Sequence, residues 1–143
     1  MNREIKILLV EDNEGDIVLT TQAFKKANVT NGVNVVKDGD EAMKYLRKQD
    51  KYGKAETPDL ILLDINLPKM DGMEVLAGIK NDEDLKSIPV VILTTSDSEN
   101  DIVKSYNNHA NCYITKPVDF NKFIEVVQLI KEFWISIVKL PKH

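Results

Sequence analysis

The sequence contains few of the residues that form disulfides, thiolate metal sites or membrane spans. Its single cysteine, Cys112, excludes an internal disulfide and a cysteine-based zinc site, and its place beside an apolar run indicates a buried structural thiol. No apolar run approaches the roughly 18 residues of a membrane span. The start "MNREIKILLVED" acquires charge too soon for a signal peptide. We therefore expect a cytoplasmic protein with no membrane contact.

The chain also lacks an excess of basic residues. It has 19 Lys and Arg against 23 Asp and Glu, which gives a formal net charge of −4 with both signs interspersed. A nucleic-acid surface needs clustered Lys and Arg, so we expect no nucleic-acid partner. Neither histidine, His109 or His143, falls where a general base is needed. The first turn, "VEDNEGD", lacks the glycines of a Rossmann dinucleotide site, and the chain has no P-loop.

The chain does have a regular alternation of apolar runs and amphipathic segments. The runs are rich in Val and Ile and read as strands at residues 5–10, 33–36, 59–64, 89–94 and 112–115. Helical spacing is found at residues 16–27, 40–49, 72–80 and 99–109, and in a fifth segment that closes the chain. Residues 48–58 read as a long surface loop. This pattern predicts one doubly wound α/β domain.

Acidic, hydroxyl and basic side chains follow four of these strands. They are Glu11 and Asp12 after the first strand, Asp64 at the end of the third, Thr94 and Thr95 at the end of the fourth, and Lys116 at the end of the fifth. Groups at the carboxyl ends of parallel strands gather at one edge of the sheet. Three carboxylates about 5 Å apart repel by roughly 3 kcal/mol per pair at an effective dielectric constant of about 20. A hard cation such as Mg²⁺ is the expected counter-charge.

Each of these features alone has an ordinary explanation. Asp12 or Asp16 could cap the first helix, a threonine at a strand end is usually part of the packing, and the Asp-Gly pairs at 38–39 and 71–72 are common in turns. Their conjunction, in this order, indicates phosphoryl chemistry. A carboxylate beside Mg²⁺, a hydroxyl donor and a lysine can accept a phosphoryl group and hold it as an acyl phosphate.

Four motifs resemble the CheY-like receiver domains of bacterial two-component response regulators. They are "LLVEDN" (8–13), "DLILLDINLPKMDG" (59–72), "PVVILTTS" (89–96) and "YITKP" (113–117). The resemblance implies a flavodoxin-like (βα)₅ fold with a five-stranded parallel sheet of order 2-1-3-4-5. It also implies a receiver domain at residues 1–132, followed by a C-terminal extension of the last helix at 133–143.

The resemblance implies a phosphoacceptor and a metal site. Asp64 would receive a phosphoryl group from a histidine kinase. Glu11, Asp12, Asp64 and the backbone carbonyl of Asn66 would hold Mg²⁺, or Mn²⁺ in its place. An alternative is a Mg²⁺-dependent phosphohydrolase with an aspartate nucleophile. Such enzymes carry a second acid two residues after the nucleophile, where this chain has Asn66, so we expect a switch rather than an enzyme.

The resemblance also implies a set of switch residues. Thr94 would be the switch hydroxyl, Lys116 the lysine that contacts the phosphoryl group, and Lys116-Pro117 a cis peptide. Tyr113 matches the aromatic switch, although a partly buried strand aromatic is an equally simple interpretation. Thr95 departs from the usual Ala, Ser or Gly after the switch threonine. Its larger side chain would narrow access to the phosphoryl group.

The sequences of several segments resemble those of the stand-alone regulators that partner bacterial phytochromes. This resemblance makes a phytochrome the candidate kinase.

The segment 118–143 is apolar around more of its circumference than one helix on a sheet requires. Either this tail packs on its own domain or the extra face binds another chain, most simply as a homodimer. The expected contact residues are Phe120, Phe123, Val127, Ile130, Phe133 and Trp134. No residues remain for an output domain, so we expect output through protein contacts.

Overall fold

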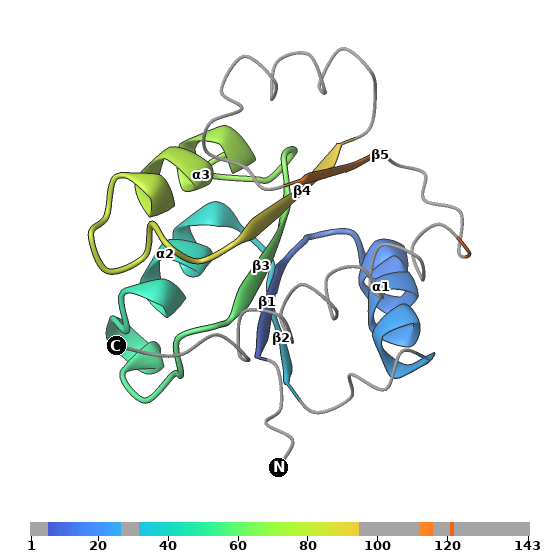
Figure 1. The fold of residues 1–143 in the computed structure, drawn as a ribbon, viewed down its shortest axis with the longest axis horizontal. Helices are drawn as coiled ribbons and strands as arrows, with labels where there is room; N and C mark the ends of the chain where they lie inside the picture. The colour runs from blue at the N-terminus through green and yellow to red at the C-terminus, as the bar shows by residue number, and fades with distance from the viewer. Residues whose placement is uncertain (1–5, 27–31, 95–111, 116–120, 122–143) are drawn as a thin grey trace, which may run out of the picture.

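A parallel five-stranded sheet forms the centre of the molecule. The computed structural model describes residues 6–26, 32–94, 112–115 and 121. The strands lie in the order β2-β1-β3-β4-β5, as Figure 1 shows. Their bounds are Ile7–Val10 (β1), Val33–Val36 (β2), Leu60–Asp64 (β3), Val90–Thr94 (β4) and Cys112–Thr115 (β5). The predicted doubly wound α/β class and strand order are therefore confirmed, with every strand starting or ending within two residues of its predicted bounds.

The burial of the strands explains their composition. Every residue of β1 and β3 is buried, so both strands are covered on both faces and are apolar without alternation. β2 forms one edge of the sheet, and its Asn34 and Val35 are exposed. A central strand therefore reads as a continuous apolar run, whereas the edge strand tolerates a polar residue.

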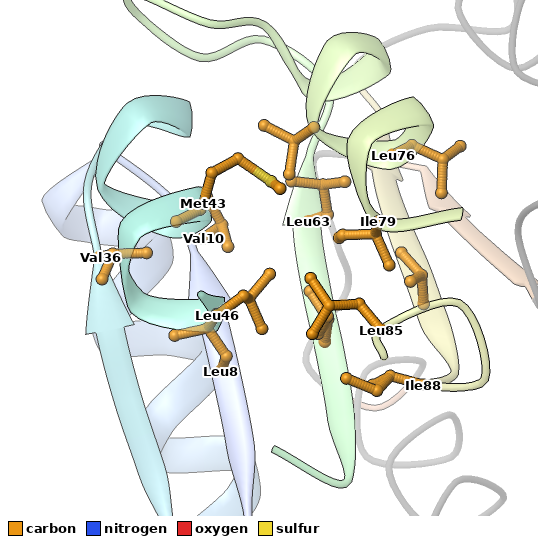
Figure 2. Packing of buried hydrophobic residues seen from close by; sticks show 14 of the residues in the cluster. Leu8, Val10, Val36, Met43, Leu46, Leu63, Leu76, Ile79, Leu85 and Ile88 are labelled. Carbon is orange, nitrogen blue, oxygen red and sulfur yellow. The ribbon is translucent and has the colours of Figure 1, made fainter. Parts of the chain in front are cut away.

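Helices cover both faces of the sheet. In Figure 1, α1 (Glu14–Lys26) lies on one side, and α2 (Gly39–Leu46) and α3 (Gly72–Lys80) lie on the other. Figure 2 shows buried side chains from the strands meeting those of α2, of α3 and of the segment between α3 and β4. The labelled ones are Leu8, Val10, Val36, Met43, Leu46, Leu63, Leu76, Ile79, Leu85 and Ile88. Burial of each such side chain contributes about 1.5–3 kcal/mol, so this core holds β1 and β3 firmly in place.

The start of α1 differs from the prediction. The helix begins at Glu14, two residues before the predicted start at Asp16. Its cap is Asn13, whose Oδ1 accepts a hydrogen bond from the Asp16 N–H at 3.0 Å. Neither Asp12 nor Asp16 therefore provides the N-cap. Helix capping does not explain why an acid stands at position 12.

The end of α2 also differs. The helix ends at Leu46, although helical spacing continues to residue 49. The chain leaves the helix because Lys48 adopts a φ of 56° and Asp50 a φ of 53°, both in the left-handed region. A short 3₁₀ helix, η1 (Asp50–Tyr52), then forms in the segment predicted as a loop, and the rings of Tyr45 and Tyr52 lie 5.3 Å apart.

The two Asp-Gly pairs mark helix starts and not simple turns. Asp38 caps α2 by accepting from the Glu41 N–H at 2.8 Å, and Asp71 caps α3 by accepting from the Glu74 N–H at 3.0 Å. Glu74 in turn accepts from the Asp71 N–H, which completes a capping box. Neither Gly39 nor Gly72 has a positive φ. The turn interpretation was therefore wrong for both pairs.

The predicted helices at 99–109 and in the segment 118–143 lie outside the described residues. Among the residues that the structure describes, no helix is both long and apolar enough to cross a membrane.

The contact of Gly72 with the end of β3 gives a first prediction. A Cβ at Gly72 would lie 2.5 Å from the Asp64 carbonyl oxygen and 2.5 Å from the Ile65 Cα. Because both neighbours are backbone atoms, Gly72→Ala should lower the free energy of unfolding by at least about 2 kcal/mol. Urea denaturation measures this loss.

Gly53→Ala is the matched control. The nearest atom to its added Cβ is 4.0 Å away, and its φ of −58° suits alanine. We expect an unchanged or slightly higher stability, by up to about 1 kcal/mol. Equal losses in the two variants would contradict the close packing of Gly72 on β3.

Candidate functional site

The strand register brings the predicted site residues to one edge of the sheet. Val10 is paired with Leu63, so the next residues, Glu11 and Asp64, leave neighbouring strands at the same level. On the other side of β3, Asp64 is paired with Leu93, which directly precedes Thr94. The parallel topology therefore gathers groups from β1, β3 and β4 at this edge.

Three carboxylates form the centre of the site. One oxygen atom from each of Glu11, Asp12 and Asp64 lies within 4.8 Å of the others. Glu11 is 0% exposed and Asp64 3% exposed, whereas Asp12 is exposed. Two of the three charges are thus inside the protein, and Asp12 lies at the solvent side of the cluster.

Each buried carboxylate accepts a hydrogen bond from the backbone two residues further along. Glu11 Oε2 accepts from the Asn13 N–H at 3.2 Å, and Asp64 Oδ1 accepts from the Asn66 N–H at 3.0 Å. Such bonds fix the direction of each side chain. They also tie the β1–α1 and β3–α3 loops to the acids they surround.

The donor set fits a hard divalent cation. Carboxylates at this separation repel by roughly 3 kcal/mol per pair at an effective dielectric constant of about 20. Mg²⁺ and similar ions bind oxygen ligands and remove this repulsion. Glu11, Asp12 and Asp64 could hold such an ion, and the backbone carbonyl of Asn66, in the loop after Asp64, stays a predicted ligand.

The other predicted residues are described less completely. Thr94 ends β4, paired with Thr115, and Tyr113 lies within β5, paired with Ile92. Thr115 directly precedes Lys116 in the chain. The remaining predicted residues fall outside the described part of the chain: Thr95, Lys116, Pro117, Phe120, Phe123, Val127, Ile130, Phe133 and Trp134.

Asn13 is a site neighbour that the sequence analysis missed. Its N–H donates to Glu11 Oε2, and its side chain caps α1 through the Asp16 N–H. One residue thus joins the acidic cluster to the first helix. The preference of Asn for helix N-caps could have identified it, because it stands three residues before the predicted helix start at Asp16.

Comparison with known families gives a match over most of the chain. Residues 7–128 match the response regulator receiver domain. Response regulator Rcp1 from Synechocystis sp. is 47% identical over 135 residues, which cover 94% of this chain and 92% of Rcp1. The probable methanogenesis regulatory protein FilR2 from Methanothrix harundinacea is 43% identical over 135 residues, with 94% of this chain and 86% of FilR2 covered.

Solved structures give the same result. The crystal structure of the phosphorylated cyanobacterial phytochrome response regulator RcpA is similar with a TM-score of 0.83 and 52% sequence identity, and the match covers 98% of this chain and 100% of RcpA. The Mn²⁺-bound form of Rcp1 is similar with a TM-score of 0.80 and 46% identity, over 96% of this chain and 99% of Rcp1.

The cluster geometry gives a second prediction. Asp12→Asn should weaken Mn²⁺ binding at least about tenfold, because one of three charged ligands is lost. Its side chain is exposed, so the fold should be unaffected. Titration calorimetry with Mn²⁺ measures the change.

Glu14→Gln is the control for a nearby acid. Glu14 forms an ion pair with Lys37 and does not belong to the cluster. This variant should bind Mn²⁺ within about twofold of the wild type. The metal assignment would fail if both variants bound equally well.

Proposed function

This chain belongs to the response regulator receiver family, and we propose that it is a signalling switch that accepts a phosphoryl group on Asp64. The observation that carries the proposal is the place of this carboxylate. It ends a fully buried strand and lies within 4.8 Å of carboxylate oxygens of Glu11 and Asp12. Because the buried core holds the end of β3, the Asp64 carboxylate is fixed in one orientation for attack on a phosphoryl group.

The reaction is an in-line displacement at phosphorus. An Asp64 carboxylate oxygen forms the new P–O bond while the P–N bond to the kinase histidine breaks, and the imidazole nitrogen keeps the electron pair. The Asn66 N–H, which donates to Asp64 Oδ1 at 3.0 Å, holds the carboxylate in one orientation during attack. The product is an aspartyl phosphate. At position 66 an amide replaces the acid that a phosphohydrolase would need, which favours a switch over an enzyme.

Glu11, Asp12, Asp64 and the Asn66 carbonyl would hold Mg²⁺ or Mn²⁺. The Mn²⁺-bound form of the relative Rcp1 supports this assignment. When bound, the ion would offset the negative charge of the carboxylates and of the phosphoryl oxygens. Glu11 is buried, so its ionised carboxylate would attract the bound ion with little screening by water.

The response to phosphorylation is proposed to run through β4 and β5. The register supports this, since Thr94 reaches the same edge as Asp64 and pairs with the residue before Lys116. Thr94 and Lys116 would move toward the phosphoryl group and Tyr113 would turn inward. The side chain of Thr95 would narrow access to the phosphoryl group. The peptide bond between Lys116 and Pro117 would be cis.

The upstream partner is proposed to be a histidine kinase of the phytochrome type. The similarity to the phytochrome response regulator RcpA supports this assignment. Residues 1–132 would form the receiver and 133–143 an extension of its last helix. Output would be a protein contact in the cytoplasm, with the apolar face of the last helix forming a homodimer.

Phosphotransfer to Asp64 gives a third prediction. Asp64→Asn should accept no label from a kinase that labels the wild-type protein, because an amide is not a nucleophile at this centre. Asp71→Asn is the control: it removes a carboxylate near the site but keeps the N-cap of α3, since Asn caps helices as well as Asp. Undiminished labelling of Asp64→Asn would disprove the assignment.

The proposed dimer gives a fourth prediction. Trp134→Glu should convert a dimer into a monomer, because a buried charge without a partner costs several kcal/mol. Size-exclusion chromatography with light scattering, with and without beryllofluoride, measures the change in mass. A wild-type protein that is monomeric in both conditions would contradict the dimer.

A further inference from the structure

The loop that carries Asn66 packs directly against the first residue of α2. A Cβ at Gly39 would lie 2.0 Å from the Met70 carbonyl oxygen and 2.8 Å from both the Met70 carbonyl carbon and its Cβ. Non-bonded atoms attract at about 3.5–4 Å and repel strongly at the shorter distances. Only glycine therefore allows these two backbones to lie so close. The β3–α3 loop, residues 65–71, is thus in contact with an element outside its own strand–helix unit.

An ion pair reinforces the contact between Gly39 and Met70. It joins the two preceding residues, Asp38 and Lys69. Asp38 Oδ1 accepts the capping bond from the Glu41 N–H, and Asp38 Oδ2 lies 3.7 Å from Lys69 Nζ. The Asp38 side chain is only 14% exposed, whereas that of Lys69 is 69% exposed. The same carboxylate therefore caps α2 and attracts the lysine of the loop.

The loop has a conformation that needs such support. Lys69 has a φ of 65°, in the left-handed region that is strained for a non-glycine residue. At its ends the loop is closed by two bonds: the Asn66 N–H donates to Asp64 Oδ1, and the Gly72 N–H donates to the Ile65 carbonyl, both at 3.0 Å. Its far side, at Lys69 and Met70, is held by α2.

We propose that Asp38 and Gly39 are positioning residues for the cation site. They hold Lys69 and Met70 of the β3–α3 loop against α2, and through the loop they fix the carbonyl of Asn66 next to Asp64. This inference rests on the proposed function, in which that carbonyl is a cation ligand. Neither residue belongs to the acidic cluster that would hold the cation. Loosening the loop should lower the affinity for the cation while leaving the nucleophile intact.

Gly39→Ala tests the proposal most strongly. Its Cβ must displace the Met70 carbonyl, so Mn²⁺ affinity should fall at least about tenfold in folded protein. In the metal-free protein, the amides of Asn66 and Gly72 should exchange hydrogen faster, while those of β1 and β3 stay protected. The measurements are titration calorimetry with Mn²⁺ and amide hydrogen exchange.

Gly78→Ala is the matched control at the same helix pair. A Cβ at Gly78 would meet the flexible end of Met43, with Cε at 3.1 Å, and no backbone atom of the loop. Its Mn²⁺ affinity should stay within about twofold of the wild type. A tenfold loss in this control as well would overturn the special role of Gly39.

Asp38→Asn and Lys69→Gln keep the proposal testable if Gly39→Ala does not fold. Asparagine retains the cap of α2 but removes the charge that faces Lys69. Because the lysine is largely exposed, each variant should weaken Mn²⁺ binding by only about two- to fivefold. The double variant should lose no more than the single ones, since both remove the same pair.

The outcomes separate this inference from the proposed function. Wild-type affinity and unchanged loop exchange in the folded variants would overturn the positioning role. Loss of affinity without faster exchange of Asn66 and Gly72 would overturn it too. A wild-type protein that binds neither Mn²⁺ nor a phosphoryl group would overturn the proposed function itself. Saturating Mg²⁺ should restore phosphoryl uptake in Gly39→Ala, whereas Asp64→Asn should stay inactive at every Mg²⁺ concentration.

Discussion

Mutual repulsion between three carboxylates is the constraint on which the rest of this site depends. Glu11 and Asp64 are held inside the protein, within 4.8 Å of each other and of Asp12. Each pair costs roughly 3 kcal/mol at an effective dielectric constant of about 20. The buried apolar residues of β1 and β3 stabilise the sheet. The fold therefore holds together an arrangement that the charges alone would push apart, and the excess negative charge is what prepares the site for a cation.

The backbone around the acids makes this arrangement tolerable. Amides of Asn13 and Asn66 donate to the two buried carboxylates, so neither carboxylate depends on water alone for its hydrogen bonds. The loops that provide these amides are fixed in turn by α1, through the Asn13 cap, and by glycines packed on backbone. The acidic site at the edge of the sheet is consequently linked by direct contacts to the starts of three helices, α1, α2 and α3.

Much of this could be predicted from the sequence, for a physical reason. Parallel strands covered on both faces are continuous apolar runs, and their topology alone brings Glu11 and Asp64 together. The end of α2 could not be predicted, because the chain turns at Lys48 with a positive φ. Glycine is the residue that usually marks such a turn, and position 48 is a lysine. The close approach of Gly39 to Met70 was equally hidden, since an Asp-Gly pair reads as a turn until its three-dimensional neighbour is known.

The central claim is that the phosphoryl group is carried by one carboxylate, placed by β3 and dependent on the cation. The most direct measurement is chemical location of that group. The wild-type protein is first phosphorylated by a phosphorylated phytochrome-type kinase. Borohydride then reduces an aspartyl phosphate to homoserine. The masses of the peptides are measured by mass spectrometry. The account predicts homoserine at position 64, formed only with Mg²⁺ present. Homoserine at another position, or equal yield without a divalent cation, would contradict it.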